Sequence, residues 1–255
     1  MVDIHGLNTK KEQSSTLQKG LVMSFVLITG GSKGIGLNMI HTFKKNNYKV
    51  IACSRRLNED IKIADLYFSC DISKKEQVSK MFREIEKKDI RIQCLINNAG
   101  IAGQDTIEDR TDDLWHNIMA TNLHGTYYVT QASLNLLDEG SSIINIASVL
   151  GHIGVPDQIA YCTAKHGIIG FTKSLAKKMA NHQIRVNAIS PGWVQTAMAK
   201  QRMSELDSNF EKMSASIPLK RIIDPQEISD MAIYLASDKA RNITGQSFII
   251  DGGFL

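Results

Sequence analysis

The sequence predicts an α/β fold in which one doubly wound parallel sheet of about seven strands is covered by helices on both faces. Three observations support this prediction. From Ser24 onward, short apolar runs alternate with amphipathic stretches, the pattern of a parallel sheet between two helical layers. The first run leads directly into glycines at positions 30, 31, 34 and 36. The chain of 255 residues, 43% of them hydrophobic, is large enough for one substantial core.

The apolar runs have the length of strands, and the stretches between them have helical spacing. We expect strands at 25–29, 49–53, 66–70, 93–96, 142–147, 185–189 and 247–250. We expect helices near 35–46, 75–87, 112–137, 158–181 and 226–236. Together these elements predict a single domain over residues 23–255.

The N-terminal region and the composition limit the classes of function. Residues 1–22 are polar without an apolar period, so we expect a mobile tail, with Met23 as an alternative start on composition alone. The chain has neither a membrane-length apolar window nor the apolar stretch of a secretory signal in its first twenty residues. The net charge of +4 comes without long like-charge blocks, so we expect no nucleic acid and no membrane as partner. Four dispersed cysteines without a C-x-x-C pair favour a reduced, cytoplasmic protein, and we expect no bound metal.

A glycine-rich loop follows the first strand. Its spacing from Thr29 is T-G-x-x-x-G-x-G, and apolar residues continue after it at helical spacing. Such a loop lets a pyrophosphate approach the N–H groups of a helix N-terminus, where the helix dipole favours negative charge. This pattern predicts a dinucleotide-binding Rossmann fold, although three glycines after a strand could also form only a turn. The loop residues expected at the cofactor are Gly30, Ser32, Lys33, Gly34, Ile35 and Gly36.

The end of the second strand indicates which nicotinamide cofactor is used. Rossmann domains selective for NAD usually have an acid there that binds the ribose 2′-hydroxyl. Here the strand ends in Ser54, Arg55 and Arg56, and the next acid is Glu59. Guanidinium groups, together with Lys33, suit a 2′-phosphate. The sequence therefore favours NADP(H), with Ser54 and Arg55 in its site; the alternative is that both arginines are solvated turn residues.

Three residues near the fifth strand indicate proton-transfer chemistry. Ser148 closes that strand, and Tyr161 and Lys165 follow at i and i+4 on one face of the next helix. A phenol with a pKa of about 10 exchanges protons poorly at neutral pH, and a neighbouring cation lowers that pKa. Ser148 follows the carboxyl end of a strand, where ligands of open α/β sheets bind, and its hydroxyl can hydrogen-bond a carbonyl. The Tyr-x-x-x-Lys spacing alone is common, and its position in the fold makes it informative.

With several further motifs, the chain resembles the short-chain dehydrogenases/reductases. The resemblance extends from about Ser24 to Leu255. Besides the glycine loop and Y-C-T-A-K at 161–165, the shared motifs are C-D-I at 70–72, N-N-A-G at 97–100, Asn122, S-P-G at 190–192 and I-D-G-G at 250–253. So many matches in the family's order make coincidence negligible.

The resemblance implies roles for individual positions. Tyr161 would be the general acid in reduction, Lys165 would lower its pKa and hold the nicotinamide ribose, and Ser148 would polarise the carbonyl. Asn122 would support a water in the proton path, and its rival interpretation is a solvated asparagine. The other implied cofactor contacts are Asp71 and Ile72 at the adenine, Asn98, Ala99 and Gly100 after the fourth strand, and Pro191, Gly192, Val194 and Thr196 at the nicotinamide.

The resemblance also implies a substrate. Residues 157–198 and 244–253 look most like 3-oxoacyl-[acyl-carrier-protein] reductases, as in fatty acid biosynthesis, and aromatic-polyketide ketoreductases. This implies reduction of a 3-oxoacyl thioester, carried by acyl carrier protein or CoA, and a homotetramer. Lys177 and Lys178 could attract an acidic carrier. Against this, residues 135–139 end in two acids, at a place where the carrier-dependent reductases that the chain resembles tend to be basic. We expect 193–217 to form a methionine-rich lid, although its apolar stripe could equally pack on the core.

Two alternatives stay open. The chain could be a dehydrogenase of a small secondary alcohol, a sugar or a steroid. It could also be a non-catalytic dinucleotide-binding protein, although such a protein would not need the intact Ser148, Tyr161, Lys165 and Asn122.

Overall fold

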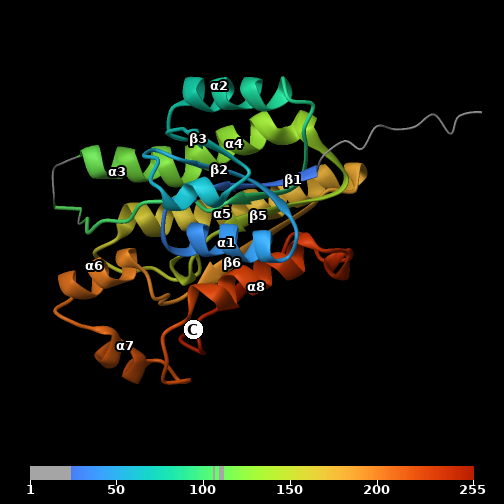
Figure 1. Ribbon diagram of the computed structural model, residues 1–255. Helices are drawn as coiled ribbons and strands as arrows, with labels where there is room; N and C mark the ends of the chain where they lie inside the picture. The colour runs from blue at the N-terminus through green and yellow to red at the C-terminus, as the bar shows by residue number, and fades with distance from the viewer. Residues whose placement is uncertain (1–23, 106, 109–111) are drawn as a thin grey trace, which may run out of the picture.

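The computed structural model describes residues 24–105, 107–108 and 112–255. The predicted polar tail at 1–22 and Met23 lie outside the described residues. The described chain forms a seven-stranded parallel sheet with the order β3-β2-β1-β4-β5-β6-β7, which confirms the predicted doubly wound fold (Figure 1). The strands are β1 (Ser24–Thr29), β2 (Lys49–Ser54), β3 (Leu66–Ser69), β4 (Arg91–Asn97), β5 (Leu137–Ile146), β6 (Arg185–Pro191) and β7 (Ser247–Ile250).

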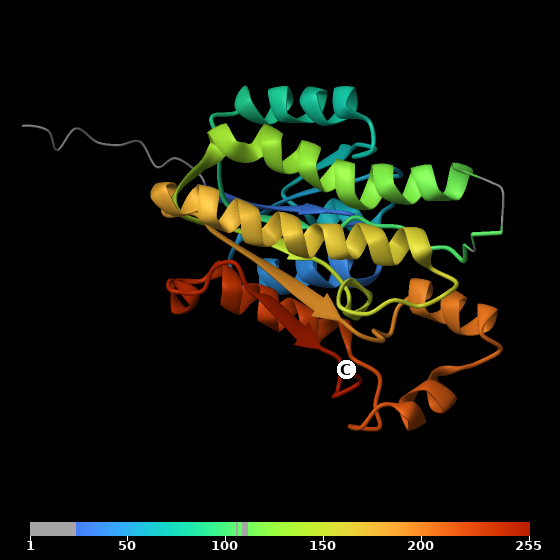
Figure 2. The same ribbon diagram turned by 180° about the vertical axis from the view of Figure 1, so that it is seen from behind.

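Helices cover both faces of the sheet (Figures 1 and 2). Successive side chains of a strand point to opposite faces, so Phe25 and Leu27 pack in one core cluster, whereas Val26 and Ile28 pack in the other. Both faces are buried, which explains why the central strands are continuously apolar. One face is covered by α2 (Lys75–Glu86), α4 (Gly125–Ser133) and α5 (Ile159–Met179), and the other by α1 (Gly34–Lys45) and α8 (Pro225–Ala236).

The helix expected at 112–137 is divided into several pieces. It begins as α3 (Asp112–Ile118), continues as a π-helical turn over Met119–His124, resumes as α4 and closes as a 3₁₀ turn over Leu134–Leu136. Leu137, expected in this helix, instead begins β5 and pairs with Ile92 of β4. The sequence does not indicate where the helix ends and β5 begins, because apolar residues continue across this boundary.

Two helices that the sequence analysis did not predict lie within the expected lid at 193–217. They are α6 (Ala197–Glu205) and α7 (Phe210–Ser216), which extend together beyond the sheet in Figure 1. Both begin at a capping side chain: Thr196 accepts from Ala199 N, and Asn209 accepts from Lys212 N. The remaining 3₁₀ turns are Asp60–Ile63, Val149–Gly151, Ala180–His182 and Asp238–Ala240. None of the helices in the described ranges is both long enough and apolar enough to span a membrane.

Candidate active site

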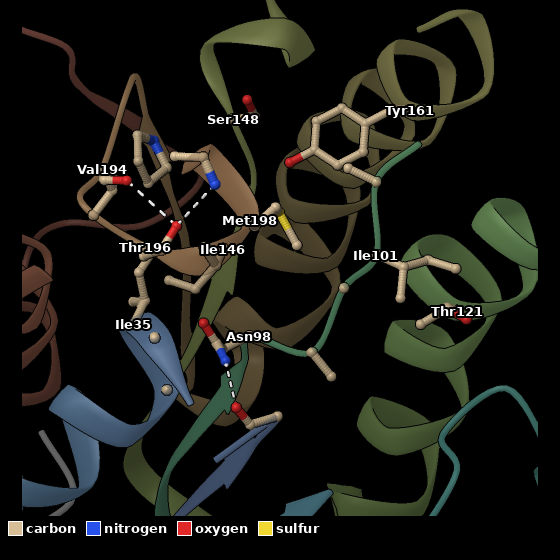
Figure 3. A pocket seen from close by; sticks show the side chains of 18 of the residues that line it. Ile35, Asn98, Ile101, Thr121, Ile146, Ser148, Tyr161, Val194, Thr196 and Met198 are labelled. Atoms are coloured by element: carbon tan, nitrogen blue, oxygen red, sulfur yellow. Dashed lines mark hydrogen bonds between the residues drawn. The ribbon is translucent and has the colours of Figure 1, made fainter. Parts of the chain in front are cut away.

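A cavity of about 1130 Å³ opens at the carboxyl ends of the strands. This is the edge of an open α/β sheet where ligands bind. All nineteen positions that the sequence assigned to the cofactor line this cavity, and so does Ser148 (Figure 3). Asn122 is the one assigned position that is not among the lining residues.

The glycine loop requires glycine at two kinds of position. Gly30 and Gly34 have φ angles of 71° and 56°, a region that side-chain-bearing residues rarely adopt. At Gly36 the limit is steric, because a Cβ atom would lie 2.3 Å from the Gly30 carbonyl oxygen. Two hydrogen bonds to the Cys53 carbonyl, from Gly30 N at 2.8 Å and Gly31 N at 3.1 Å, tie the loop to β2.

Asn98 holds the same loop from the β4 side. Its Nδ2 donates to the Thr29 carbonyl at 2.9 Å and to the Gly30 carbonyl at 3.3 Å. In return, Thr29 Oγ1 accepts from Asn98 N and Ala99 N, both at 3.0 Å. The family resemblance implies only that Asn98 is a cofactor contact after the fourth strand. The structure adds that its side chain braces the glycine loop (Figure 3).

The start of α1 fits a bound pyrophosphate. The first N–H groups of a helix have no partner within the helix, and Lys33 at the N-cap makes no side-chain cap. The residues at this helix start, Gly34, Ile35 and Gly36, line the cavity. A glycine cradle that a Cβ would fill, beside free N–H groups and a helix dipole, suits a dinucleotide.

The turn after β2 presents Arg55 and Arg56 to the cavity, and both are exposed. Ser54, which was assigned to the cofactor, is buried, and its hydroxyl donates to the Arg56 carbonyl at 2.5 Å. Ser54 therefore shapes the turn that displays the arginines. Asn58 was not predicted from the sequence. Its Nδ2 donates to the Ser32 carbonyl at 3.0 Å and links this turn to the glycine loop.

The expected adenine end is formed by Asp71 and Ile72 after β3. Asp71 Oδ1 accepts from the Ser73 hydroxyl at 2.7 Å and from Ser73 N at 3.0 Å. The buried Ile72 packs against Gly125, where a Cβ would lie 2.8 Å from the isoleucine side chain. The close approach of α4 thus fixes one wall of the cavity.

Tyr161 and Ser148 turn their hydroxyl groups toward the same space (Figure 3). Ser148 Oγ accepts from Leu150 N at 3.1 Å, which leaves its own hydrogen free to be donated to a ligand. Lys165 Nζ lies 5.5 Å from the centroid of the Tyr161 ring and donates to the Ile146 carbonyl at 2.7 Å. The predicted group of three is therefore assembled at one point of the cavity.

In the protein alone, burial has the largest effect on the pKa values of Tyr161 and Lys165. It raises the pKa of Tyr161 to about 12, an effect that the Ser148 hydroxyl opposes. It lowers the pKa of Lys165 to about 8. The family resemblance implies that Lys165 lowers the pKa of Tyr161. The side chains of the protein alone produce no net lowering of the Tyr161 pKa, because burial removes the phenol and the ammonium from water and outweighs the attraction between them.

Asn122 is buried in the π-helical turn between α3 and α4. Its Oδ1 accepts from Ile101 N and its Nδ2 donates to the Ile101 carbonyl, both at 2.8 Å. It holds the segment after β4 close to Lys165: a Cβ on Gly100 would lie 3.3 Å from Asn122 Oδ1 and 3.8 Å from Lys165 Nζ. Asn122 is thus a support of the site and not a solvated asparagine.

The segment after β6 forms the opposite wall. Gly192 N donates to the Ile250 carbonyl at 2.8 Å, which joins this segment to β7. Thr196 Oγ1 donates to the Val194 carbonyl at 3.3 Å and accepts from Ala199 N at 3.2 Å, as drawn in Figure 3. Its methyl group would lie 3.5 Å from a Cβ on Gly34, so this wall approaches the glycine loop.

Few residues at the substrate end of the cavity were predicted from the sequence. Met198, 43% exposed, turns into the cavity on the side of Tyr161 (Figure 3), whereas Met203 of the same helix is buried. The apolar stripe of the expected lid thus serves both the cavity and the core. Other lining residues that carry no cofactor assignment include Leu150, Val155, Pro156, Asp157, Gln158, Arg202, Leu206 and Phe254.

The chain is similar to known oxidoreductases over most of its length. A family profile described as enoyl-(acyl carrier protein) reductase matches residues 30–255. The 3-oxoacyl-[acyl-carrier-protein] reductase FabG of Chlamydia pneumoniae is 34% identical over 246 residues, which cover 91% of this chain and 97% of that protein. Ligand-free aldohexose dehydrogenase of Thermoplasma acidophilum superposes with a TM-score of 0.84 at 32% identity, covering 92% of this chain and 94% of that one. ElxO with NADP bound superposes with a TM-score of 0.81 at 29% identity, covering 91% and 99%.

Proposed function

The chain belongs to the short-chain dehydrogenase/reductase family, and we propose that it is an NADPH-dependent reductase that converts a 3-oxoacyl thioester to the 3-hydroxyacyl thioester. One observation carries the proposal: the hydroxyl groups of Tyr161 and Ser148 face one cavity that also contains the glycine loop. Two hydroxyl donors at one point suit a carbonyl oxygen that gains negative charge during reduction.

When bound, the dihydronicotinamide supplies a hydride to the carbonyl carbon. Ser148 donates a hydrogen bond to the carbonyl oxygen. Tyr161 then transfers its proton to that oxygen, so the C=O double bond becomes a C–H and an O–H bond. The raised pKa of Tyr161 keeps the phenol protonated at neutral pH, as a general acid must be. Lys165 stabilises the phenolate until a proton from solvent replaces the one transferred.

The choice of NADPH rests on Arg55. It lines the cavity at the end of β2 together with Arg56, and Lys33 approaches from the glycine loop. Three cations without an acid at that strand end suit a 2′-phosphate better than a ribose hydroxyl. ElxO, whose solved structure contains NADP, has the same fold.

The choice of a 3-oxoacyl thioester rests on relatives named for this reaction and on the apolar wall around Met198. Steady-state assays with NADPH would compare acetoacetyl-CoA, a carrier-bound 3-oxoacyl chain and free ketones. Crotonyl-CoA tests reduction of a C=C bond, the reaction in the family profile's description. We expect turnover of at least one 3-oxoacyl thioester and none of crotonyl-CoA. Inactivity on both 3-oxoacyl thioesters would overturn the proposed substrate.

Tyr161→Phe tests the assigned acid. Loss of a general acid costs about 10² to 10⁴ in rate, so turnover of the best ketone should fall by that factor. The dissociation constant of NADPH, measured by fluorescence titration, should change less than about threefold because the ring remains. Unchanged turnover would show that another group provides the proton.

A second candidate is a sugar dehydrogenase. It is favoured by the similarity to aldohexose dehydrogenase and by polar side chains at the substrate end of the cavity, including Asp157, Gln158 and Arg202. Oxidation of aldohexoses with NADP and with NAD at alkaline pH tests it directly.

We also propose that 193–217 acts as the lid over the substrate. This is supported by α6, which contributes both Met198 and Arg202 to the wall of the cavity. A carrier protein would have to approach past this segment. Lys177 and Lys178 do not serve this approach: they are exposed in the last turn of α5, about 24 Å along the helix from Tyr161 and the cavity.

A further inference from the structure

An ion pair joins the lid to the loop that leads into the catalytic helix. The guanidinium of Arg202 on α6 contacts Asp157 Oδ2 through Nη2, and its Nη1 lies 3.2 Å from Glu205 Oε2. These side chains are only 11%, 23% and 25% exposed, respectively. We call Asp157, Arg202 and Glu205 the clasp.

Asp157 is held in position by its backbone. Its carbonyl accepts from Asp105 N at 3.0 Å, and Asp105 also forms a bridge with Gln158. The carboxylate of Asp105 in turn accepts from Ala160 N at 2.9 Å, immediately before Tyr161. The clasp is therefore attached to the same segment that positions the general acid.

The clasp determines the charge at the substrate end of the cavity. Both Asp157 and Arg202 line the cavity, and with Glu205 they sum to one negative charge. Of the five other charged lining residues in the described chain, four lie at the cofactor end, and only Lys165 lies at the reacting group. Lys33, Arg55, Arg56 and Asp71 are at the glycine loop and the ends of β2 and β3, and Lys165 is beside the Tyr161 ring.

We propose that the clasp is a specificity determinant that rejects ketones with a free carboxylate beyond the reacting carbonyl and accepts their uncharged esters and thioesters. A substrate carboxylate could pair with Arg202 only by displacing Asp157, which would then be a partly buried acid without its partner. Such a displaced charge is costly. An uncharged ester oxygen can instead accept one of the guanidinium N–H groups, because two of the five are used in the contacts above. This inference rests on the proposed ketone reduction.

Two ketones that differ only in charge test it. The wild-type enzyme should reduce ethyl acetoacetate with a kcat/KM about a hundredfold above that for acetoacetate, since like-charge contacts are strongly disfavoured in such sites. Asp157→Asn removes the competing charge and frees Arg202. The ratio should then fall at least tenfold, mainly through faster reduction of acetoacetate. A purely structural role for Asp157 would slow both ketones and leave their ratio unchanged, and that result would overturn the proposal.

Glu211→Gln provides the matched control. It removes one negative charge from α7 of the lid, but Glu211 is exposed and is not a lining residue of the cavity. The ratio of kcat/KM for ethyl acetoacetate to that for acetoacetate should equal the wild-type ratio. An equal effect of Glu211→Gln and Asp157→Asn would mean that general lid charge, and not the clasp, controls selection.

A binding measurement distinguishes failure of this inference from failure of the proposed reaction. Ligand-observed NMR would measure the affinity of each ketone for the Tyr161→Phe protein loaded with NADPH. The same affinities would be measured for the protein that also carries Asp157→Asn. If the wild type reduces neither ketone, the reaction proposed for these ketones fails, and the binding ratio still decides the clasp. The proposal is supported if acetoacetate binds more weakly than ethyl acetoacetate and Asp157→Asn removes this difference. Equal binding of the two ketones to the protein without Asp157→Asn overturns it.

Discussion

Arg55 is the residue on which cofactor preference should depend most. NADPH and NADH differ only in the 2′-phosphate, and the exposed Arg55 side chain lines the cavity at the strand end expected to meet it. Loss of a charge-assisted hydrogen bond to a charged group costs about 1.5 to 3 kcal/mol. Arg55→Ala should therefore weaken NADPH binding by about ten- to a hundredfold and leave NADH within about threefold.

Isothermal titration with both cofactors measures this difference. Arg83→Ala is the control, because Arg83 is exposed on α2 and is not a lining residue of the cavity. It should change neither affinity. Equal losses of NADPH and NADH binding in Arg55→Ala would assign the 2′-phosphate to another group.

Lys165 is maintained at a cost to stability. Its pKa is about 8 in the folded protein, against 10.5 for an ordinary lysine. Since the folded pKa is depressed, the unfolded chain holds more protons between pH 8 and 10.5, and stability rises with pH across that window. Below pH 8 the buried ammonium costs about 3 kcal/mol relative to a lysine in water.

Lys165→Met should consequently stabilise the fold while it reduces turnover. The lost hydrogen bond to Ile146 offsets about 1 kcal/mol, so the free energy of unfolding at pH 7 should rise by about 2 kcal/mol. Most of this gain should disappear at pH 10. Urea unfolding at the two pH values measures it, with the exposed Lys173→Met on the same helix as the unchanged control. A destabilised Lys165→Met at pH 7 would contradict the burial argument.

Among the elements, the adjacent ends of the paired strands β1 and β4, next to the glycine loop, depend on Thr29. Its fully buried hydroxyl accepts from both Asn98 N and Ala99 N. Thr29→Val keeps the shape but leaves these two N–H groups without an acceptor, which should cost about 2 to 4 kcal/mol of stability. Thr29→Ser retains the hydroxyl and should cost about 1 kcal/mol. Thermal unfolding compares them, and equal losses would mean that the methyl group, and not the hydroxyl, matters.

The same elements explain how far the sequence could predict the fold. Strands with both faces buried are continuous apolar runs, so all seven were located to within a few residues. Only at β5 was an end missed by more than two residues, because Leu134, Leu136 and Leu137 continue the helical period into the strand. The π-helical turn around Asn122 has no recognisable sequence pattern. Asn122 was found by family resemblance, whereas its contacts to Ile101 required the structure.

The residues of the candidate site also differ in how well the sequence predicted them. Most cofactor residues lie within short motifs at strand ends, where local spacing fixes their geometry, and all of them line the cavity. The substrate end is built from distant segments. Asp157 and Arg202 are 45 residues apart, and no local pattern indicates that the short helix α6 brings them together.

At the scale of the whole molecule, apolar side chains remain exposed at one edge of the sheet. β7 is the edge strand, and Ile249 on it is 44% exposed, beside Phe254 at 39% and Leu255 at 47%. An open, apolar edge favours pairing with another chain. The family resemblance implies a homotetramer, and we propose that two copies of this chain meet at β7.

Light scattering after size exclusion should then give a mass of about 113 kDa, four times 28.3 kDa. Ile249→Lys introduces a charge into the apolar edge, where its burial against a second copy would be costly, so the mass should fall to about half of that value. Ile63→Lys is the control, because Ile63 is similarly exposed, at 42%, but lies in the 3₁₀ turn before β3 at the opposite end of the sheet. A monomeric wild type, or equal dissociation by both substitutions, would rule out assembly through β7.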